Sequence, residues 1–171
     1  MRIKILSWNV RGLNDSRKRS TIKSLLMKWK ADIVCLQETK IEDWSQQLVN
    51  SLWGNRWASW AELQANGTRG GIIILWDKRF WKSVNIEPGT YSVSVILESI
   101  QEQFRWCYTG VYGPHTNSER EDLWYELASI RGTWDGQWVL GGDFNVCRFD
   151  YEKFNCHRRT RAMENFSETT L

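Results

Sequence analysis

The chain has 171 residues and a mass of 20.2 kDa, which is enough for one domain and short for two. Its 42% hydrophobic and 25% charged residues exclude a wholly disordered chain, and its two prolines and twelve glycines exclude proline-rich or collagen-like low complexity. The longest apolar run, around 70–76, is far shorter than the roughly 20 residues that cross a bilayer, and no signal-peptide stretch follows the first residues. We therefore expect an intracellular protein, nuclear or cytoplasmic, with no membrane partner.

The charge and the unusual residue types set further limits. A net charge of +3 is compatible with a polyanionic partner but is too small to indicate one. The twelve tryptophans are expected mainly at half-buried layer contacts, because each carries a large apolar area and one N–H donor. No cysteine pair has C-x-x-C spacing and only two histidines are present, so we expect reduced thiols and no zinc site.

Apolar spacing in the first third of the chain predicts two helices alternating with strands. The expected elements are a strand over 2–10, a helix capped by Asn14 or Asp15 with Ile22, Leu25, Leu26 and Trp29 on one face, a buried strand over 32–36, and a helix marked by Trp44, Leu48 and Leu52 that ends at Gly54.

The remainder is rich in strands. The expected elements are a turn at Asn66-Gly67, strands over 72–76, 81–86, 92–97 and 104–109 (the last two joined by a hairpin at 99–102), a helix striped by Leu123, Trp124, Leu127 and Ile130, a strand over 138–140 that stops at Gly141-Gly142, and a helix from about 158. Helices interleaved with hairpins and isolated strands indicate a layered α/β architecture.

Four stretches place polar residues where an apolar strand leaves the core: SWNV (7–10), LQET (36–39), YGPH (112–115) and GDFN (142–145). Strand ends that meet at one edge of a sheet are common places for sites, because the core holds them rigid. Taken singly, each residue is more typical of a cap, a turn or a solvated side chain. Their combination in this order is the informative signal.

The residue types at these strand ends fit phosphate chemistry. In an extended chain Asp143 and Asn145 share one face while Phe144 packs on the other, so a carboxylate and an amide could orient a water and hold a phosphoryl oxygen. Glu38 supplies an oxygen ligand for Mg²⁺, which often takes only one or two carboxylates. The other strand ends add an amide, a phenol and an imidazole: Asn9, Tyr112 and His115.

The ordered segments SWNVRGL, LQETK, GGIIILWD, GVYGPH and GGDFNV resemble the endonuclease/exonuclease/phosphatase superfamily. Over residues 1–166 the chain is most similar to the N-terminal endonuclease domain of plant LINE-type (non-LTR) retrotransposons. The resemblance implies a single domain over 1–171 with an α/β fold, a four-layer αββα sandwich of two packed mixed β-sheets flanked by helices. It also implies cleavage of phosphodiester bonds in DNA with Mg²⁺ or Mn²⁺, and a reverse transcriptase domain following in the original polyprotein.

The resemblance also implies roles for the matching residues. Glu38 corresponds to the metal ligand, and Asn9 to the neighbour that helps to hold the metal-bound phosphate. Tyr112 corresponds to the tyrosine that contacts the scissile phosphate. Asp143 corresponds to the residue that aligns or deprotonates the attacking water, and Asn145 to the amide beside it.

Three departures from the family pattern matter. Arg11 stands where the abasic-site repair endonucleases carry an acid, which points away from the repair branch, and His115 stands where the family usually has Asn, although an imidazole can still donate to phosphate. No match is found for the later strands with a second acid and a near-terminal histidine, since His157 comes too early. We therefore expect a fold incomplete at the C-terminus and a weak or inactive nuclease.

The leading hypothesis is a DNA-nicking endonuclease of a retrotransposon. The alternatives are a superfamily phosphatase acting on a small phosphorylated substrate, and a non-catalytic remnant with at most DNA-binding or interaction properties. The basic residues at 17–19 and 158–161 are either solvated helix faces or DNA contacts, and the salt dependence of binding separates these two cases.

Overall fold

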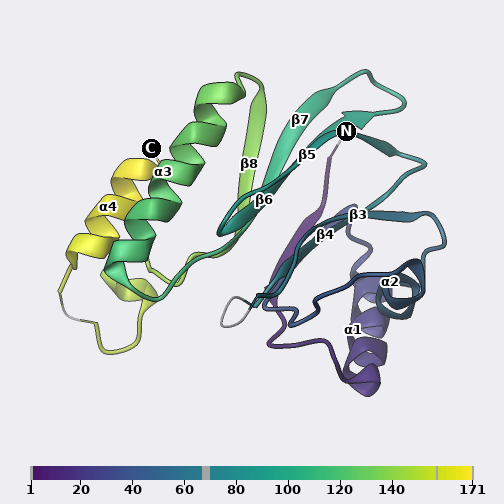
Figure 1. Cartoon of the computed structure of the whole chain (residues 1–171), viewed down its shortest axis with the longest axis horizontal. Helices are drawn as coiled ribbons and strands as arrows, with labels where there is room; N and C mark the ends of the chain where they lie inside the picture. The colour runs from purple at the N-terminus through teal and green to yellow at the C-terminus, as the bar shows by residue number, and fades with distance from the viewer. Residues whose placement is uncertain (1, 67–69, 157, 171) are drawn as a thin grey trace.

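Two four-stranded β-sheets pack face to face, and helices cover their outer faces (Figure 1). The computed structural model describes residues 2–66, 70–156 and 158–170. In chain order the elements are β1 (Ile5–Asn9), α1 (Ser16–Trp29), β2 (Ile33–Gln37), α2 (Gln46–Trp53), β3 (Ala58–Leu63), β4 (Ile72–Asp77), β5 (Trp81–Pro88), β6 (Ser92–Ser99), β7 (Arg105–Tyr112), α3 (Asn117–Thr133), β8 (Gln137–Asp143), the 3-10 turn η1 (Asp150–Glu152) and α4 (Arg161–Thr169).

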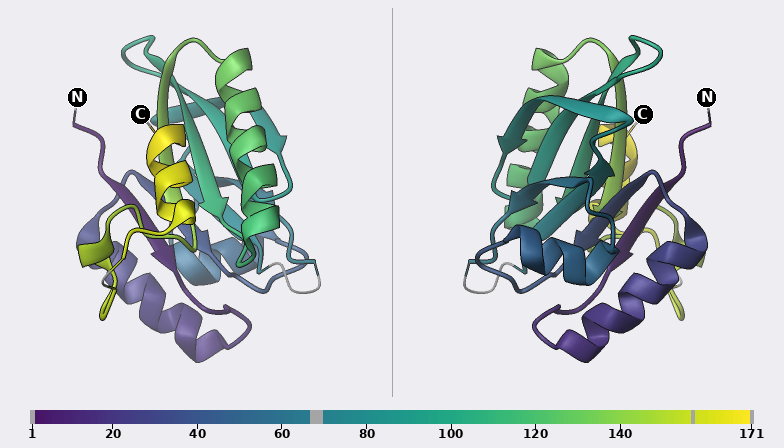
Figure 2. Two further views of the ribbon diagram at one scale, coloured as in Figure 1. Left: turned by 90° about the vertical axis from the view of Figure 1, so that its left-hand side faces the viewer. Right: turned by 90° about the vertical axis from the view of Figure 1, so that its right-hand side faces the viewer.

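The strand order is β1-β2-β4-β3 in the first sheet and β5-β6-β7-β8 in the second. Each sheet has one parallel pair, β1 with β2 and β7 with β8, and its other pairs are antiparallel. Helices α1 and α2 lie over the first sheet, and α3 and α4 lie together over the second (Figure 2). The expected α/β sandwich of two mixed sheets flanked by helices is confirmed.

Side-chain caps explain where the helices begin. Asp15 accepts a hydrogen bond from the Arg17 N–H at the start of α1, and Ser45 does the same for the Leu48 N–H at the start of α2. Gly54 ends α2 in the left-handed region at φ +58°, which a glycine adopts without steric cost. Thr116 and Thr160 cap α3 and α4, so the last helix begins slightly later than its expected start near 158.

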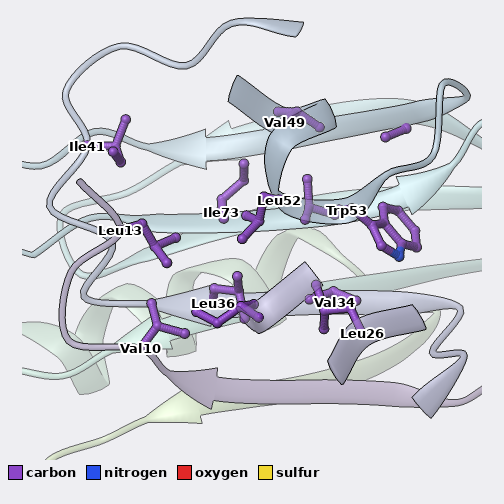
Figure 3. Packing of buried hydrophobic residues seen from close by; sticks show 13 residues of the cluster. Val10, Leu13, Leu26, Val34, Leu36, Ile41, Val49, Leu52, Trp53 and Ile73 are labelled. Atoms are coloured by element: carbon purple, nitrogen blue, oxygen red, sulfur yellow. The ribbon is translucent and has the colours of Figure 1, made fainter. Parts of the chain in front are cut away.

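The core has three layers of apolar side chains. Beneath α1 and α2 lies a cluster that includes Leu26, Leu36, Leu52 and Ile73 (Figure 3). A second cluster fills the space between the sheets, and a third lies under α3. All five residues of β2 are buried, because alternate side chains face the helices and the opposite sheet.

The tryptophans follow their expected distribution, with one exception. Four are buried, seven are half-buried and Trp29 is exposed. Trp29 was expected on the buried face of the first helix, but its ring is 42% exposed and packs edge-on against Trp8 at 5.8 Å between centroids. It is the last residue of α1.

Several element boundaries differ from expectation. The strand expected over 2–10 is confined to Ile5–Asn9, and Phe104, expected as the first residue of the strand over 104–109, precedes β7 and is 40% exposed. Strand β3 was not expected at all, because its burial repeats every third residue instead of every second. The turn expected at Asn66-Gly67 falls partly outside the described residues.

The Gly141-Gly142 pair does not stop β8, which continues to Asp143. A Cβ at Gly141 would collide with the Tyr108 hydroxyl, and one at Gly142 with the Val111 carbonyl oxygen. The two glycines therefore allow β8 to lie close to β7 instead of breaking the strand. This correction matters for the site, because it places Asp143 in register with Tyr112.

Among the described residues, no helix is both long and apolar enough to span a membrane.

Candidate active site

The ends of the two parallel strand pairs bring the candidate residues together. Asn9 ends β1 opposite Gln37, the residue before Glu38, and Tyr112 ends β7 opposite Asp143 at the end of β8. The Asn9 side-chain amide donates a hydrogen bond of 2.8 Å to Asp143 Oδ2. The polar strand ends of both sheets thus meet at one end of the sandwich.

Asp143 is held by donors on both of its oxygens. Oδ2 accepts from the Asn9 amide, and Oδ1 accepts from the Asn145 N–H at 3.0 Å. Its backbone carbonyl also accepts from the Gly113 N–H at 2.6 Å, which ties the ends of β7 and β8 together. A carboxylate fixed in this way has little rotational freedom, so it can hold a water in one orientation.

Asn145 lies differently from the expectation of an extended chain. Its backbone turns into the left-handed region at φ +51°, and its side-chain amide donates to the Gly113 carbonyl at 2.5 Å. The expected same-face pairing with Asp143 is therefore wrong, because the strand ends at Asp143 and the next residues turn. Phe144 does pack inward, against the cluster under α3, as expected.

Glu38 sits at the mouth of β2 in a strained conformation. Its φ is +56°, and Arg11, Lys40 and Asn145 in the neighbouring loops also have positive φ. Non-glycine residues in this region cost of the order of 1 kcal/mol and concentrate at functional sites. The Glu38 side chain is 21% exposed and forms an ion pair of 3.4 Å with Lys40 Nζ.

Gly70 makes room for Glu38. A Cβ at Gly70 would lie 2.7 Å from Glu38 Cγ and 2.8 Å from Glu38 Cα, closer than real Cβ atoms approach. The Gly70 carbonyl also accepts a 2.6 Å hydrogen bond from the Lys40 N–H. The GGIIILWD segment therefore contributes the backbone against which Glu38 rests.

Tyr112 is paired with Asp143 across β7 and β8. Burial raises the pKa of its phenol first, and the negative charges of Glu38 and Asp143, with a hydrogen bond to Glu38, raise it further. The hydroxyl therefore keeps its proton at neutral pH and acts as a donor. Asn9 bonds to Asp143 and lies opposite the residue before Glu38, so the two acids lie at the same end of the sandwich.

His115 is not part of this cluster of contacts. It follows the buried Pro114, is exposed, and within the described chain has no hydrogen bond to the other candidate residues. Arg120, in contrast, was not singled out from the sequence. It donates from Nη2 to the Asn145 carbonyl at 2.8 Å and from Nη1 to Asn117 Oδ1 at 2.6 Å, so it supports the loop after β8. No pattern in the sequence distinguishes it from other helix cations.

The donor set fits a weakly ligated hard cation. Within 2–66, 70–156 and 158–170 no group of three or more His, Cys, Asp or Glu side chains could hold a metal. Glu38 offers a half-buried carboxylate, and among the described residues Asn9 Oδ1 accepts only the Arg11 N–H, at 3.1 Å, which leaves a second lone pair. One carboxylate, an amide oxygen, water and substrate phosphate together suit Mg²⁺.

A family model described as "Endonuclease/Exonuclease/phosphatase family" matches residues 6–167. The chain belongs to this family. It is therefore a domain of a hydrolase family that includes nucleases and phosphatases, whose members are typically dependent on divalent metals.

Solved structures share the endonuclease/exonuclease/phosphatase fold with this chain. A mannosyl-6-phosphatase of Bacteroides thetaiotaomicron VPI-5482 has a TM-score of 0.71 at 12% identity, over 98% of this chain and 70% of that one. An endonuclease/exonuclease/phosphatase family protein of Bacteroides thetaiotaomicron has a TM-score of 0.70 at 12% identity, over 97% and 68%. The human nocturnin catalytic domain has a TM-score of 0.61 at 18% identity, over 85% and 64%.

One curated relative shares a short segment with higher identity. An exodeoxyribonuclease of Bacillus subtilis (strain 168) is 49% identical over 41 residues. This segment is 24% of the present chain and only 16% of the bacterial enzyme. The likeness is therefore local, although it is much stronger per residue than the likeness to the solved structures.

Proposed function

We propose that this chain is the DNA-nicking endonuclease domain of a LINE-type retrotransposon and hydrolyses one phosphodiester bond with Mg²⁺ or Mn²⁺. The observation that carries the proposal is the 2.8 Å hydrogen bond from Asn9 to Asp143, which joins the polar strand ends of the two sheets next to Glu38 and Tyr112. The choice of DNA is supported by the segment shared with the exodeoxyribonuclease. The retrotransposon affiliation is supported by the order of the sequence motifs from SWNVRGL to GGDFNV.

The proposed reaction assigns one task to each side chain. Glu38 and Asn9 would hold the cation, which neutralises charge developing on the phosphoryl oxygens when it is bound. The protonated Tyr112 donates to a non-bridging oxygen of the scissile phosphate. Asp143, oriented by Asn9 and by the Asn145 N–H, accepts a proton from the water that attacks phosphorus. As this bond forms, the bond from phosphorus to the leaving sugar oxygen breaks, and that oxygen takes a proton from solvent.

The remaining two candidates have supporting tasks in this proposal. The Asn145 side chain fixes the loop after β8 through the Gly113 carbonyl, and therefore fixes Asp143 indirectly. His115 is exposed at the start of the segment leading into α3, where an imidazole can donate to a phosphate oxygen of bound DNA. Neither task requires the side chain to touch the attacking water.

The test is a nicking assay on supercoiled plasmid with Mg²⁺. Since we expect a weak nuclease, open-circular product should form slowly with the wild type, and its rate should fall by roughly a further 100-fold in Glu38→Ala and in Asp143→Ala. Glu102→Ala, an exposed acid in the β6–β7 turn, is the matched control and should cleave like the wild type. Cleavage that survives unchanged in both site variants would overturn the proposal.

The alternatives give different results in the same experiment. A phosphatase would release phosphate from inositol or sugar phosphates and leave the plasmid supercoiled, an activity suggested by the resemblance in fold to the mannosyl-6-phosphatase. A non-catalytic remnant would cleave neither substrate with either metal, with at most retention of plasmid in a gel-shift assay.

A further inference from the structure

A pocket of about 580 Å³ opens beside Asp143. Its walls come from the loop after β8 and from the first turns of α3 and α4. These two helices lie side by side, joined by the stacked rings of Trp124 and Phe166 with centroids 5.4 Å apart (Figure 1). The pocket and the proposed catalytic carboxylate therefore share one wall, the segment that runs from β8 into its loop.

The charges around this pocket are unbalanced. Arg120, Lys153 and Arg161 line it, and Asp143 is the only acid among its lining residues. None of the three cations forms an ion pair within the described residues. Lys153 and Arg161 are exposed, so both can bind an anion without breaking an existing ion pair.

Arg120 is the cation of this pocket that is held in place. Its Nη1 donates to Asn117 Oδ1 at 2.6 Å and its Nη2 to the Asn145 carbonyl at 2.8 Å, so the guanidinium charge is fixed at the wall of the pocket. A cation that is already fixed loses little conformational freedom when an anion binds beside it.

We propose that this pocket binds a backbone phosphate next to the scissile one, so that the substrate is a polynucleotide strand and not a small phosphorylated molecule. The proposal rests on the proposed function, because it takes Asp143 to mark the point of attack. A monophosphate held at Asp143 would leave the three cations unpaired. A DNA strand carries a second phosphate to the pocket and gains two to three charge-assisted contacts there.

The test removes two exposed cations of the pocket that contact none of the proposed catalytic residues. Lys153→Ala/Arg161→Ala is compared with Lys28→Ala/Lys82→Ala, which removes the same charge from α1 and β5. Two measurements are made on each protein. The first is the Kd for a fluorescein-labelled DNA duplex in EDTA between 50 and 200 mM NaCl, and the second is hydrolysis of thymidine 5′-p-nitrophenyl phosphate, a diester with a single phosphate.

Each phosphate that is neutralised contributes about 0.9 to the slope of log K against log salt, so the one phosphate of this pocket corresponds to roughly a 3.5-fold difference across this fourfold salt range. We expect the wild type and the Lys28/Lys82 variant to lose roughly three to four times more affinity than the Lys153/Arg161 variant. Hydrolysis of the single-phosphate diester should be the same in all three proteins. Circular dichroism confirms that each variant is folded.

The possible outcomes separate the subsite from the proposed function. Equal salt slopes in the two double variants would overturn the subsite, whatever the activity. Loss of diester hydrolysis in the Lys153/Arg161 variant would also overturn it, because the pocket would then serve the chemical step. Absence of both diester hydrolysis and plasmid nicking in the wild type, with the expected difference in salt slope, would refute the proposed endonuclease and leave the phosphate site standing.

Discussion

The hydrogen bond between Asn9 and Asp143 should be measurable as a coupling between the two sheets. Asn9→Ala removes the amide that donates to Asp143 Oδ2 at 2.8 Å and frees the Arg11 N–H, which is exposed and can bond to water. A hydrogen bond to a charged group contributes about 1.5–3 kcal/mol, and this one is only part-buried, so we expect about 1.5 kcal/mol. For a chain of this length, such a loss lowers Tm by about 3–6 °C.

The assay is a double-mutant cycle of Asn9→Ala and Asp143→Ala, with urea unfolding followed by tryptophan fluorescence. The coupling free energy of the pair should be about 1 kcal/mol or more, because each single variant already abolishes the bond. The matched control Asn66→Ala changes an exposed asparagine and should lie within about 0.5 kcal/mol of the wild type. A coupling free energy below about 0.3 kcal/mol would refute this reasoning, since the two side chains would then act independently.

Three further predictions concern the packing around the site. Gly70→Ala should reduce nicking by about 100-fold without unfolding the protein, because the new Cβ displaces Glu38; unchanged nicking would contradict the close contact. Burial raises the pKa of the Cys35 thiol from 9.0 to about 11, so the folded state holds this proton more tightly than the unfolded state. The free energy of unfolding should therefore fall by up to roughly 3 kcal/mol between about pH 9 and 11, and by less in Cys35→Ala. Urea unfolding at each pH measures this change. In native protein at pH 8 a thiol reagent should label the half-buried Cys147 and not the buried Cys35, as detected by mass spectrometry of peptides. Labelling of Cys35 at a rate similar to Cys147 would show that the sheets open readily and would contradict this prediction.

The fold was predictable where burial is one-sided or complete over several residues. Strand β2 is an unbroken apolar run, and α2 carries both its Ser45 cap and its Gly54 end in the sequence. Strand β3 was missed because Ala58 and Ala61 are its only buried positions, a spacing that resembles neither a strand nor a long helix. Gly141 and Gly142 were predicted to end their strand. Their actual role is to allow β8 to lie close to β7, and this contact cannot be inferred from the local sequence.

The candidate site was predictable as a set of strand ends, and its internal geometry was not. The convergence of Asn9, Glu38, Tyr112 and Asp143 follows from placing each polar residue after an apolar strand. The turn at Asn145 and the support from Arg120 arise from hydrogen bonds to backbone carbonyls. Such bonds depend on the relative positions of two loops, which cannot be predicted from the residue types alone.

The site is divided evenly between the two sheets, so its geometry depends on how the two sheets pack against each other. Asn9 and Glu38 come from the first sheet, Tyr112 and Asp143 from the second, and the sheets meet closely where Gly110 faces the Cys35 sulfur. A small sliding of one layer over the other would separate the amide from its carboxylate while each sheet stayed hydrogen-bonded. A substitution at this contact can therefore act in two distinct ways. It can lower the stability of the protein, and it can shift Asn9 and Glu38 relative to Tyr112 and Asp143.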